Sequence, residues 1–197
     1  DFATIQDFCA CALISEIGED EFYFKCWFWI SQQQYDDRRL TMPNIKKWRD
    51  DGWLSVCPGN TIDLGIVHRD IKKIFTEQKI FMAGYDNFKS DPITQPLTEE
   101  FGQVMGPEKK YVDRIQPYGQ SMKYMSAPTK EFERMVRQKK IFHDGNPVFR
   151  WMLGNVTLYR DSEDNYKPDK GRSSEKIDGP VAGVIATGMW LDNRLMT

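Results

Sequence analysis

The sequence predicts an α/β fold, with a mixed sheet that begins in a β-hairpin and is flanked by helices. Residues 21–30 alternate with the period of two that is typical of a strand, and a shorter apolar run at residues 8–14 precedes them. Farther along, a helix-patterned segment leads into a second apolar run at residues 80–86, and another helix pattern begins near residue 178. Strand-like runs that alternate with helical segments indicate the α/β class.

The hairpin consists of residues 8–14, a polar turn at residues 16–20 that contains Gly18, and residues 21–30. One face of the second strand carries Phe22, Phe24, Cys26, Phe28 and Ile30, and the other carries Tyr23, Lys25, Trp27 and Trp29. Asp7 would lie at a strand end, close behind Asp1. Taken alone, an Asp at the first position is more typical of a frayed terminus than of a metal ligand.

The second candidate acid is Asp86, which ends the apolar run 80–86. The helix-patterned residues before this run are Ile66, Val67, Ile71, Ile74 and Phe75. We expect a buried strand that extends the hairpin sheet and places the Asp86 carboxylate at its C-terminal end, where ligands collect in open α/β sheets. The alternative is a turn formed by the pair Asp86-Asn87.

The third candidate acid, Asp178, precedes an apolar helix predicted for residues 178–191. We expect Asp178 to be the N-cap, with Pro180 just inside the helix, where its missing N–H costs nothing. Asp178 could serve only as this cap, or it could also be a metal ligand. A metal site would need companion carboxylates, because Mg²⁺ binds through one or two carboxylates, water and substrate phosphate.

Composition agrees with one soluble domain, residues 1–197. No apolar run approaches the roughly 20 residues that span a bilayer, and no signal peptide is present, so we expect no membrane partner. No phosphate-loop motif is present, so we expect no ATP hydrolysis, and the missing initiator Met suggests a fragment of a longer protein.

The four cysteines lack the paired Cys-x-x-Cys spacing of a zinc site. We expect them to be buried free thiols in a reducing cytoplasm: Cys9, Cys11, Cys26 and Cys57.

The net charge of −2 is compatible with DNA binding if the acids gather at a metal site and basic patches lie elsewhere. One candidate patch is the helix-like stretch 130–140, whose Phe132, Met135 and Val136 should face the core; its alternative is a solvated surface. The other is a polar, mobile loop before Asp178 that would contact DNA or serve as a connector: Lys167, Lys170, Arg172 and Lys176.

An ordered set of short motifs covers nearly the whole chain. It comprises Asp1-x(5)-Asp7 before the hairpin, Pro58-Gly59-Asn60-Thr61-Ile62-Asp63, Tyr85-Asp86, Gly145-Asn146-Pro147, Gly154-Asn155-Val156, Lys167-Pro168-Asp169-Lys170 and Lys176-Ile177-Asp178-Gly179. In this order the motifs resemble the C-terminal nuclease domain of the large terminase subunit of tailed bacteriophages. In that family the first strand runs up to the first acid, whereas almost nothing precedes Asp1 here.

The resemblance implies a ribonuclease H-like fold in which acidic residues hold divalent metals and cut double-stranded DNA. Carried over by position, the catalytic and metal-binding acids are Asp1, Asp86 and Asp178, with Asp7 as an additional metal ligand. The implied cofactor is Mg²⁺ or Mn²⁺. Two ions about 3.5–4 Å apart would activate a water and stabilise the leaving 3′ oxygen.

The resemblance also implies the context of this activity. The chain would be the nuclease part of a longer terminase, without its ATPase domain, and would cut concatemeric viral DNA during genome packaging with low sequence specificity. The implied partners are double-stranded DNA, the terminase ATPase domain, the small terminase subunit and the portal. The implied location is the cytoplasm of an infected or lysogenic bacterial host.

Two other readings remain open. The domain could be a non-catalytic module that binds DNA or the portal, with structural acids. It could also be another ribonuclease H-like nuclease, such as a transposase or a resolvase, although the motif order between Pro58 and Trp151 argues against that. Metal dependence separates an enzyme from the binding module.

Overall fold

The computed structural model describes residues 8–86, 91–106 and 110–194. Asp1 and Asp7 therefore lie outside the described residues. The predicted hairpin is confirmed: β1 (Cys9–Gly18) and β2 (Glu21–Ser31) pair antiparallel. Its turn is tighter than expected, because the strand β1 continues through Gly18 and only residues 19 and 20 connect the two strands.

The strand β2 is the centre of a mixed sheet. Two short strands run parallel to it at its opposite ends: β3 (Ser55–Cys57), with Trp29 opposite Ser55, and β8 (Ile141–His143), with Phe22 opposite Ile141. The prediction of an antiparallel hairpin combined with parallel strands, flanked by helices, is confirmed.

The strand that ends at Asp86 differs in two ways from the expectation. The strand β4 spans Ala83–Asp86, so it is shorter than the predicted run 80–86, and its residues are only half-buried. Among the described residues it does not extend the hairpin sheet but pairs in parallel with β7 (Ile115–Tyr118) in a separate sheet. A cavity of about 490 Å³ is lined by residues 10–17 of β1 and residues 82–85 at β4, among others.

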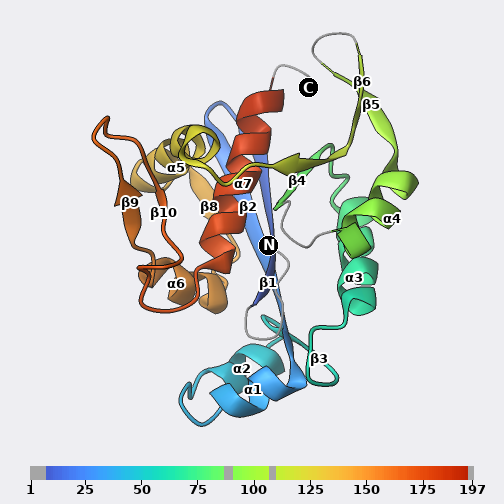
Figure 1. Ribbon diagram of the computed structural model, residues 1–197, viewed down its shortest axis with the longest axis vertical. Coiled ribbons are helices and arrows are strands. Elements are labelled where there is room, and N and C mark those ends of the chain that lie inside the picture. Colours follow the sequence, from blue (N-terminus) through green and yellow to red (C-terminus); the bar gives the residue numbers. More distant parts are fainter. Residues whose placement is uncertain (1–7, 87–90, 107–109, 195–197) are drawn as a thin grey trace.

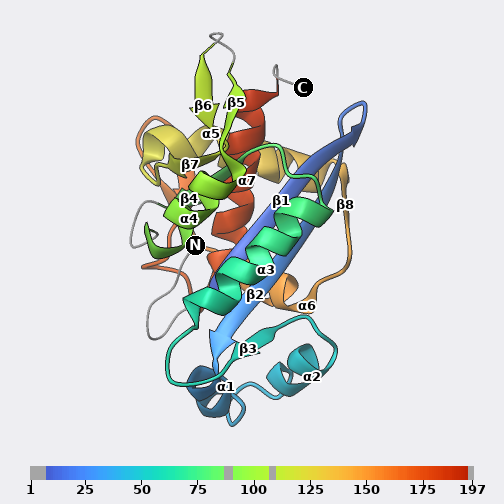
Figure 2. The same cartoon turned by 90° about the vertical axis from the view of Figure 1, so that its right-hand side faces the viewer.

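Helices cover both faces of the hairpin. The helix α3 (Leu64–Glu77) lies across one face, as Figure 2 shows. The helix α7 (Asp178–Asn193) lies on the other, together with α5 (Met122–Arg137) and α6 (Pro147–Gly154) (Figure 1). Each face has its own apolar core: Phe24 and Phe28 pack in the cluster that contains α7, whereas Trp29 packs with α3. The face of β2 with Phe24 and Phe28 is buried, whereas on the other face Trp29 is buried and Tyr23, Lys25 and Trp27 are half-buried.

Capping side chains explain where two of these helices begin. Asp63 is the N-cap of α3 and accepts hydrogen bonds from the backbone N–H groups of Gly65 (2.8 Å) and Ile66 (3.3 Å). Asn146 is the N-cap of α6, which has Pro147 in its first turn. The side-chain oxygen of Asn146 accepts from the N–H groups of residues 148 and 149, while its Nδ2 donates to the Cys26 carbonyl (3.1 Å).

The remaining elements surround this centre. The short helices α1 (Gln32–Arg38) and α2 (Ile45–Asp50) lie at one end of the hairpin (Figure 1). The helix α4 (Asp91–Phe101) leads into a small hairpin of β5 (Gln103–Met105) and β6 (Tyr111–Asp113). A second small antiparallel pair consists of β9 (Leu158–Arg160) and β10 (Tyr166–Pro168).

Of the stretch 130–140, residues 130–137 form the second half of α5, which ends at Arg137. Phe132 and Met135 are buried as expected, but the expectation for Val136 is wrong, because its side chain is 44% exposed. Each helical residue turns by about 100°, so Val136 points away from the face that Met135 presents to the core.

The four cysteines are free thiols, as expected; three are buried and Cys11 is half-buried. Burial raises the pKa of Cys11 to about 12, which keeps this thiol protonated. Among the helices that the structure describes, none is both long and apolar enough to cross a membrane.

Candidate functional site

Asp178 is the first residue of α7 rather than its N-cap. The N-cap is Ile177, whose apolar side chain makes no capping hydrogen bond. The prediction of a capping role for Asp178 is therefore wrong, although the helix begins where the sequence indicated. A carboxylate in the first turn is still favoured by the partial positive charge of the helix N-terminus.

The carboxylate of Asp178 is buried, with only 3% of the residue exposed. Its Oδ1 lies 3.1 Å from the Nζ of Lys170, whereas its Oδ2 is buried with no hydrogen-bond partner among the described residues. A buried oxygen without a partner costs about 1–3 kcal/mol, and more when charged. A bound ion, an ordered water or a catalytic role can account for such an atom.

The surrounding core fixes the position of Asp178. The N–H of Gly179 lies 3.2 Å from the sulfur of Met152 in α6, and Asn155 donates a hydrogen bond to the Lys176 carbonyl (3.1 Å). The backbone at Gly179 also approaches β2 closely, because a Cβ built there would lie 2.8 Å from the ring of Phe28. The acid is therefore held by the packing between α6, α7 and β2.

Asp86 is the last residue of β4 and is half-buried. The strand β4 packs against α7, since a Cβ at Gly84 would meet the side chains of Met189 and Ile185. Asp86 lies opposite Tyr118 in the parallel register with β7, and Gln120 follows two residues later. The carboxyl end of β7 thus leads into the loop that carries Gln120, and it lies beside the carboxyl end of β4.

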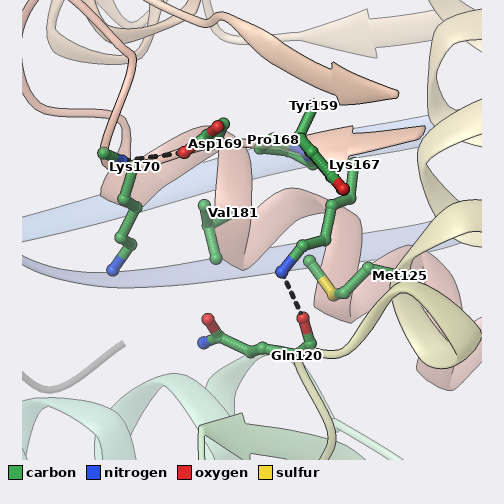
Figure 3. A pocket seen from close by; sticks show the side chains of 9 residues that line it. Gln120, Met125, Tyr159, Lys167, Pro168, Asp169, Lys170 and Val181 are labelled. Carbon is green, nitrogen blue, oxygen red and sulfur yellow. Dashed lines mark hydrogen bonds between the residues drawn. The ribbon is translucent and has the colours of Figure 1, made fainter. Parts of the chain in front are cut away.

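This loop and the β10 segment enclose a cavity of about 340 Å³ (Figure 3). Lys167 and Lys170 both line it, and the Nζ of Lys167 donates a hydrogen bond to the Gln120 carbonyl at 2.7 Å. Because Lys170 also pairs with Asp178, the cavity adjoins the buried acid. The structure therefore brings two of the four predicted basic residues, and the loop that follows β7, close to Asp178.

The segment 167–176 is more ordered than the sequence suggested. The side chain of Asp169 accepts hydrogen bonds from the N–H groups of Gly171 (2.9 Å) and Arg172 (3.3 Å), which forms a compact turn. The guanidinium of Arg172 lies over the ring of Tyr159, which lines the cavity, although Arg172 does not line it itself. Lys176 is half-buried, and its backbone carbonyl accepts a hydrogen bond from Asn155, the C-cap of α6.

No group of three or more His, Cys, Asp or Glu side chains is arranged to hold a metal ion within the described residues. Asp86 and Asp178 lie on packed elements, whereas Asp1 and Asp7 fall outside the described part of the chain. The assignment of these four acids as ligands therefore remains a prediction. What the structure does provide is one buried carboxylate with an unpaired oxygen, beside a lysine-lined cavity.

Sequence reasoning missed Gln120, whose side-chain Nε2 is buried without a hydrogen-bond partner among the described residues. The only signal was its place in a motif-like stretch with Tyr118 and Gly119. Tyr118 has a structural role: its hydroxyl donates to the Tyr124 carbonyl (3.2 Å), and burial raises its pKa to about 12.

Comparisons with known proteins agree with this architecture. Residues 1–193 match the family model described as terminase large subunit, endonuclease domain. Protein YmfN of Escherichia coli (strain K12) is 30% identical over 169 residues, which are 82% of this chain and 34% of that protein. The large terminase subunit of Enterobacteria phage HK97 is 23% identical over 189 residues, 95% of this chain and 36% of that protein.

The crystal structure of the HK97 large terminase resembles the fold, with a TM-score of 0.80 at 22% identity over 93% of this chain and 37% of that one. The chain spans about a third of the length of the relatives it matches.

Proposed function

Since the chain belongs to the family of terminase large subunit endonuclease domains, we propose that it is a metal-dependent endonuclease that cuts concatemeric double-stranded viral DNA during genome packaging. The observation that carries the proposal is the buried Asp178 carboxylate, whose Oδ2 has no partner among the described residues and whose Oδ1 is paired with Lys170. A family match and a buried acid with spare ligand capacity support the same chemistry.

The residues present fit a hard divalent cation. Carboxylate oxygens are the ligands that Mg²⁺ and Mn²⁺ prefer, and an unpaired buried carboxylate oxygen is a ready ligand. Asp178 and Asp86 would hold the metal, with Asp1 and Asp7 as further ligands predicted from the sequence. When bound, a pair of such ions activates a water molecule and stabilises the leaving oxygen of a phosphodiester.

The chain's own residues orient the DNA. Lys170 neutralises Asp178, and its ammonium also lines the cavity beside it. Lys167 and Lys170 would hold the sugar-phosphate backbone there, while Arg172 and Lys176 contribute positive charge along the same segment. Contacts of this kind position a duplex without reading base edges, so the proposed cleavage has low sequence specificity.

The family match favours a terminase over a transposase or a resolvase. The proposed partners are those of the packaging machinery: double-stranded DNA, the terminase ATPase domain, the small subunit and the portal, in the cytoplasm of the bacterial host. A non-catalytic DNA- or portal-binding module is the remaining rival, and it predicts no metal-dependent cleavage.

The test is nicking and linearisation of supercoiled plasmid with Mg²⁺ or Mn²⁺, with EDTA as the metal-free arm. The variants are Asp178→Asn and, as a matched control, Asp37→Asn, which changes an exposed acid on α1. We expect metal-dependent cleavage by the wild type, unchanged in Asp37→Asn and reduced about 100-fold or more in Asp178→Asn. Circular dichroism checks that each variant is folded, and calorimetry measures Mg²⁺ binding directly.

Cleavage that persists in EDTA, or a folded Asp178→Asn variant as active as the wild type, would reject the metal mechanism at this acid. Absence of both cleavage and metal binding in the wild type would favour the binding module instead.

A further inference from the structure

The cavity between β10 and the loop at residues 118–120 has two kinds of lining. Its apolar part is formed by Met125, Pro168 and Val181, with Tyr159 at the side. Its polar part is formed by Lys167, Lys170 and Gln120, among others. At about 340 Å³ the cavity falls in the size range of small-ligand sites, so it can receive part of a nucleotide.

The polar groups of this cavity suit an anion. Figure 3 shows the two lysine side chains and the Gln120 amide extending toward the space below Val181. Asp169, the one acid that the described residues contribute to the lining, is already engaged: its Oδ1 accepts from the backbone of Gly171, and its Oδ2 lies 3.5 Å from the Nε of Arg172. Two ammonium groups and an amide therefore face this space, and the Asp169 carboxylate beside them is satisfied.

Gln120 gives the second, independent observation. Its backbone carbonyl accepts a hydrogen bond from the Nζ of Lys167 (2.7 Å), which fixes the loop against β10. Its side-chain Nε2, by contrast, is buried and has no partner in the described part of the chain. A buried donor without an acceptor is costly and rare in native structures, so a bound acceptor is the simplest account of it.

We propose that this cavity binds a backbone phosphate of the DNA strand that is held at Asp178, with Gln120 as the residue that positions it. The inference rests on the proposed function, because it takes DNA as the ligand. The phosphate accepts hydrogen bonds from the Gln120 amide and from Lys167 and Lys170, and the attached sugar packs on Val181. Because Lys170 also contacts Asp178, this phosphate lies next to the reacting one.

The test is DNA binding in EDTA, so that no cleavage occurs, measured by fluorescence anisotropy of a labelled duplex over a range of salt concentrations. The variants are Gln120→Ala, Gln120→Glu and Lys167→Met. The matched control is Gln116→Ala, which removes an amide on β7 that donates to the Asp113 carbonyl. Circular dichroism shows which variants are folded; Gln120→Glu keeps the size of the side chain if Gln120→Ala does not fold.

We expect Gln120→Ala to bind about tenfold more weakly with an unchanged salt slope, because a neutral donor releases no counterion. Gln120→Glu should bind more weakly still, since it places a negative charge beside the phosphate. Lys167→Met should lower the magnitude of the slope by about 0.9. Gln116→Ala should bind like the wild type.

Wild-type affinity in both Gln120 variants would overturn the inference. Plasmid cleavage with Mg²⁺ by the same preparations separates the two proposals. If the wild type cuts DNA but the Gln120 variants bind normally, only this inference fails. If the Gln120 variants bind weakly but the wild type does not cut, the phosphate site stands and the nuclease proposal fails.

Discussion

Replacing Gly179 with Ala should destabilise the domain by overpacking the start of α7. A Cβ at this position would lie 2.8 Å from the Cε1 and Cζ atoms of Phe28 and 3.2 Å from the Cδ2 of Phe149. Phe28 is only 2% exposed and packs within the larger apolar core, so its ring cannot swing out into solvent to make room for the added methyl group. Either the ring or the first turn of α7 must shift.

The magnitude follows from two opposing terms. Overpacking of a well-filled core costs about 1–3 kcal/mol. Ala gains up to about 1 kcal/mol over Gly in a helix interior, and less in a first turn. We therefore expect the free energy of unfolding to fall by about 1–2 kcal/mol, which lowers the urea midpoint by about 0.5–1 M for a slope near 2 kcal/mol/M. Because Asp178 is the adjacent residue, plasmid cleavage should fall as well.

The assay is urea denaturation followed by circular dichroism, with Gly154→Ala as the matched control. Gly154 ends α6 and has open space around its Cα, so the same substitution there should raise the free energy of unfolding by about 0.4–1 kcal/mol. A Gly179→Ala variant as stable as the wild type would refute the close approach of α7 to β2.

Three further predictions concern other contacts. Asn146→Ala should cost about 2–3 kcal/mol in urea denaturation, because it removes the N-cap of α6 and leaves the buried Cys26 carbonyl unpaired; a loss below about 0.5 kcal/mol would contradict this. The hydrogen bond from Tyr166 lowers the pKa of Glu133 below its usual 4.5, so this pair stabilises the fold above pH 4.5 and less as the pH falls through the lowered pKa. Tyr166→Phe should therefore be less stable than the wild type by about 1 kcal/mol at pH 7, and the difference should shrink in acid; a gap that is constant to pH 2 would be evidence against it. Saturating Mg²⁺ should raise the melting temperature of the wild type but not of Asp178→Asn, by an amount equivalent to about 2.7 kcal/mol at 100 times the Kd, and equal shifts in both would count against Asp178 as a ligand.

Local patterns in the sequence predicted the parts of the fold that depend on neighbouring residues. The alternation in residues 21–30 predicted β2, and the helical spacing from Val67 to Phe75 predicted α3, because burial of one face imposes each period. Asp86 and Asp178 were placed correctly at element ends for the same reason.

Long-range pairing was not predictable in this way. Nothing local specifies that β4 pairs with β7, that Lys170 contacts Asp178, or that the Lys167 ammonium meets the Gln120 carbonyl. The strand pairing and the Lys167 contact join segments far apart in the chain, and the Lys170 contact depends on how the turn after β10 folds back onto the start of α7.

The elements around the candidate site differ in how freely they can evolve. Asp178 stands at the head of α7, the helix that fills the main core, so any movement of this acid disturbs the packing on which folding depends. Lys167 and Lys170 instead lie on β10 and in the turn after it, at the edge of the domain. Substitutions on β10 and in the turn after it can therefore change the charge at the edge of the cavity without disturbing the core, whereas a shift of Asp178 would disturb the packing of α7.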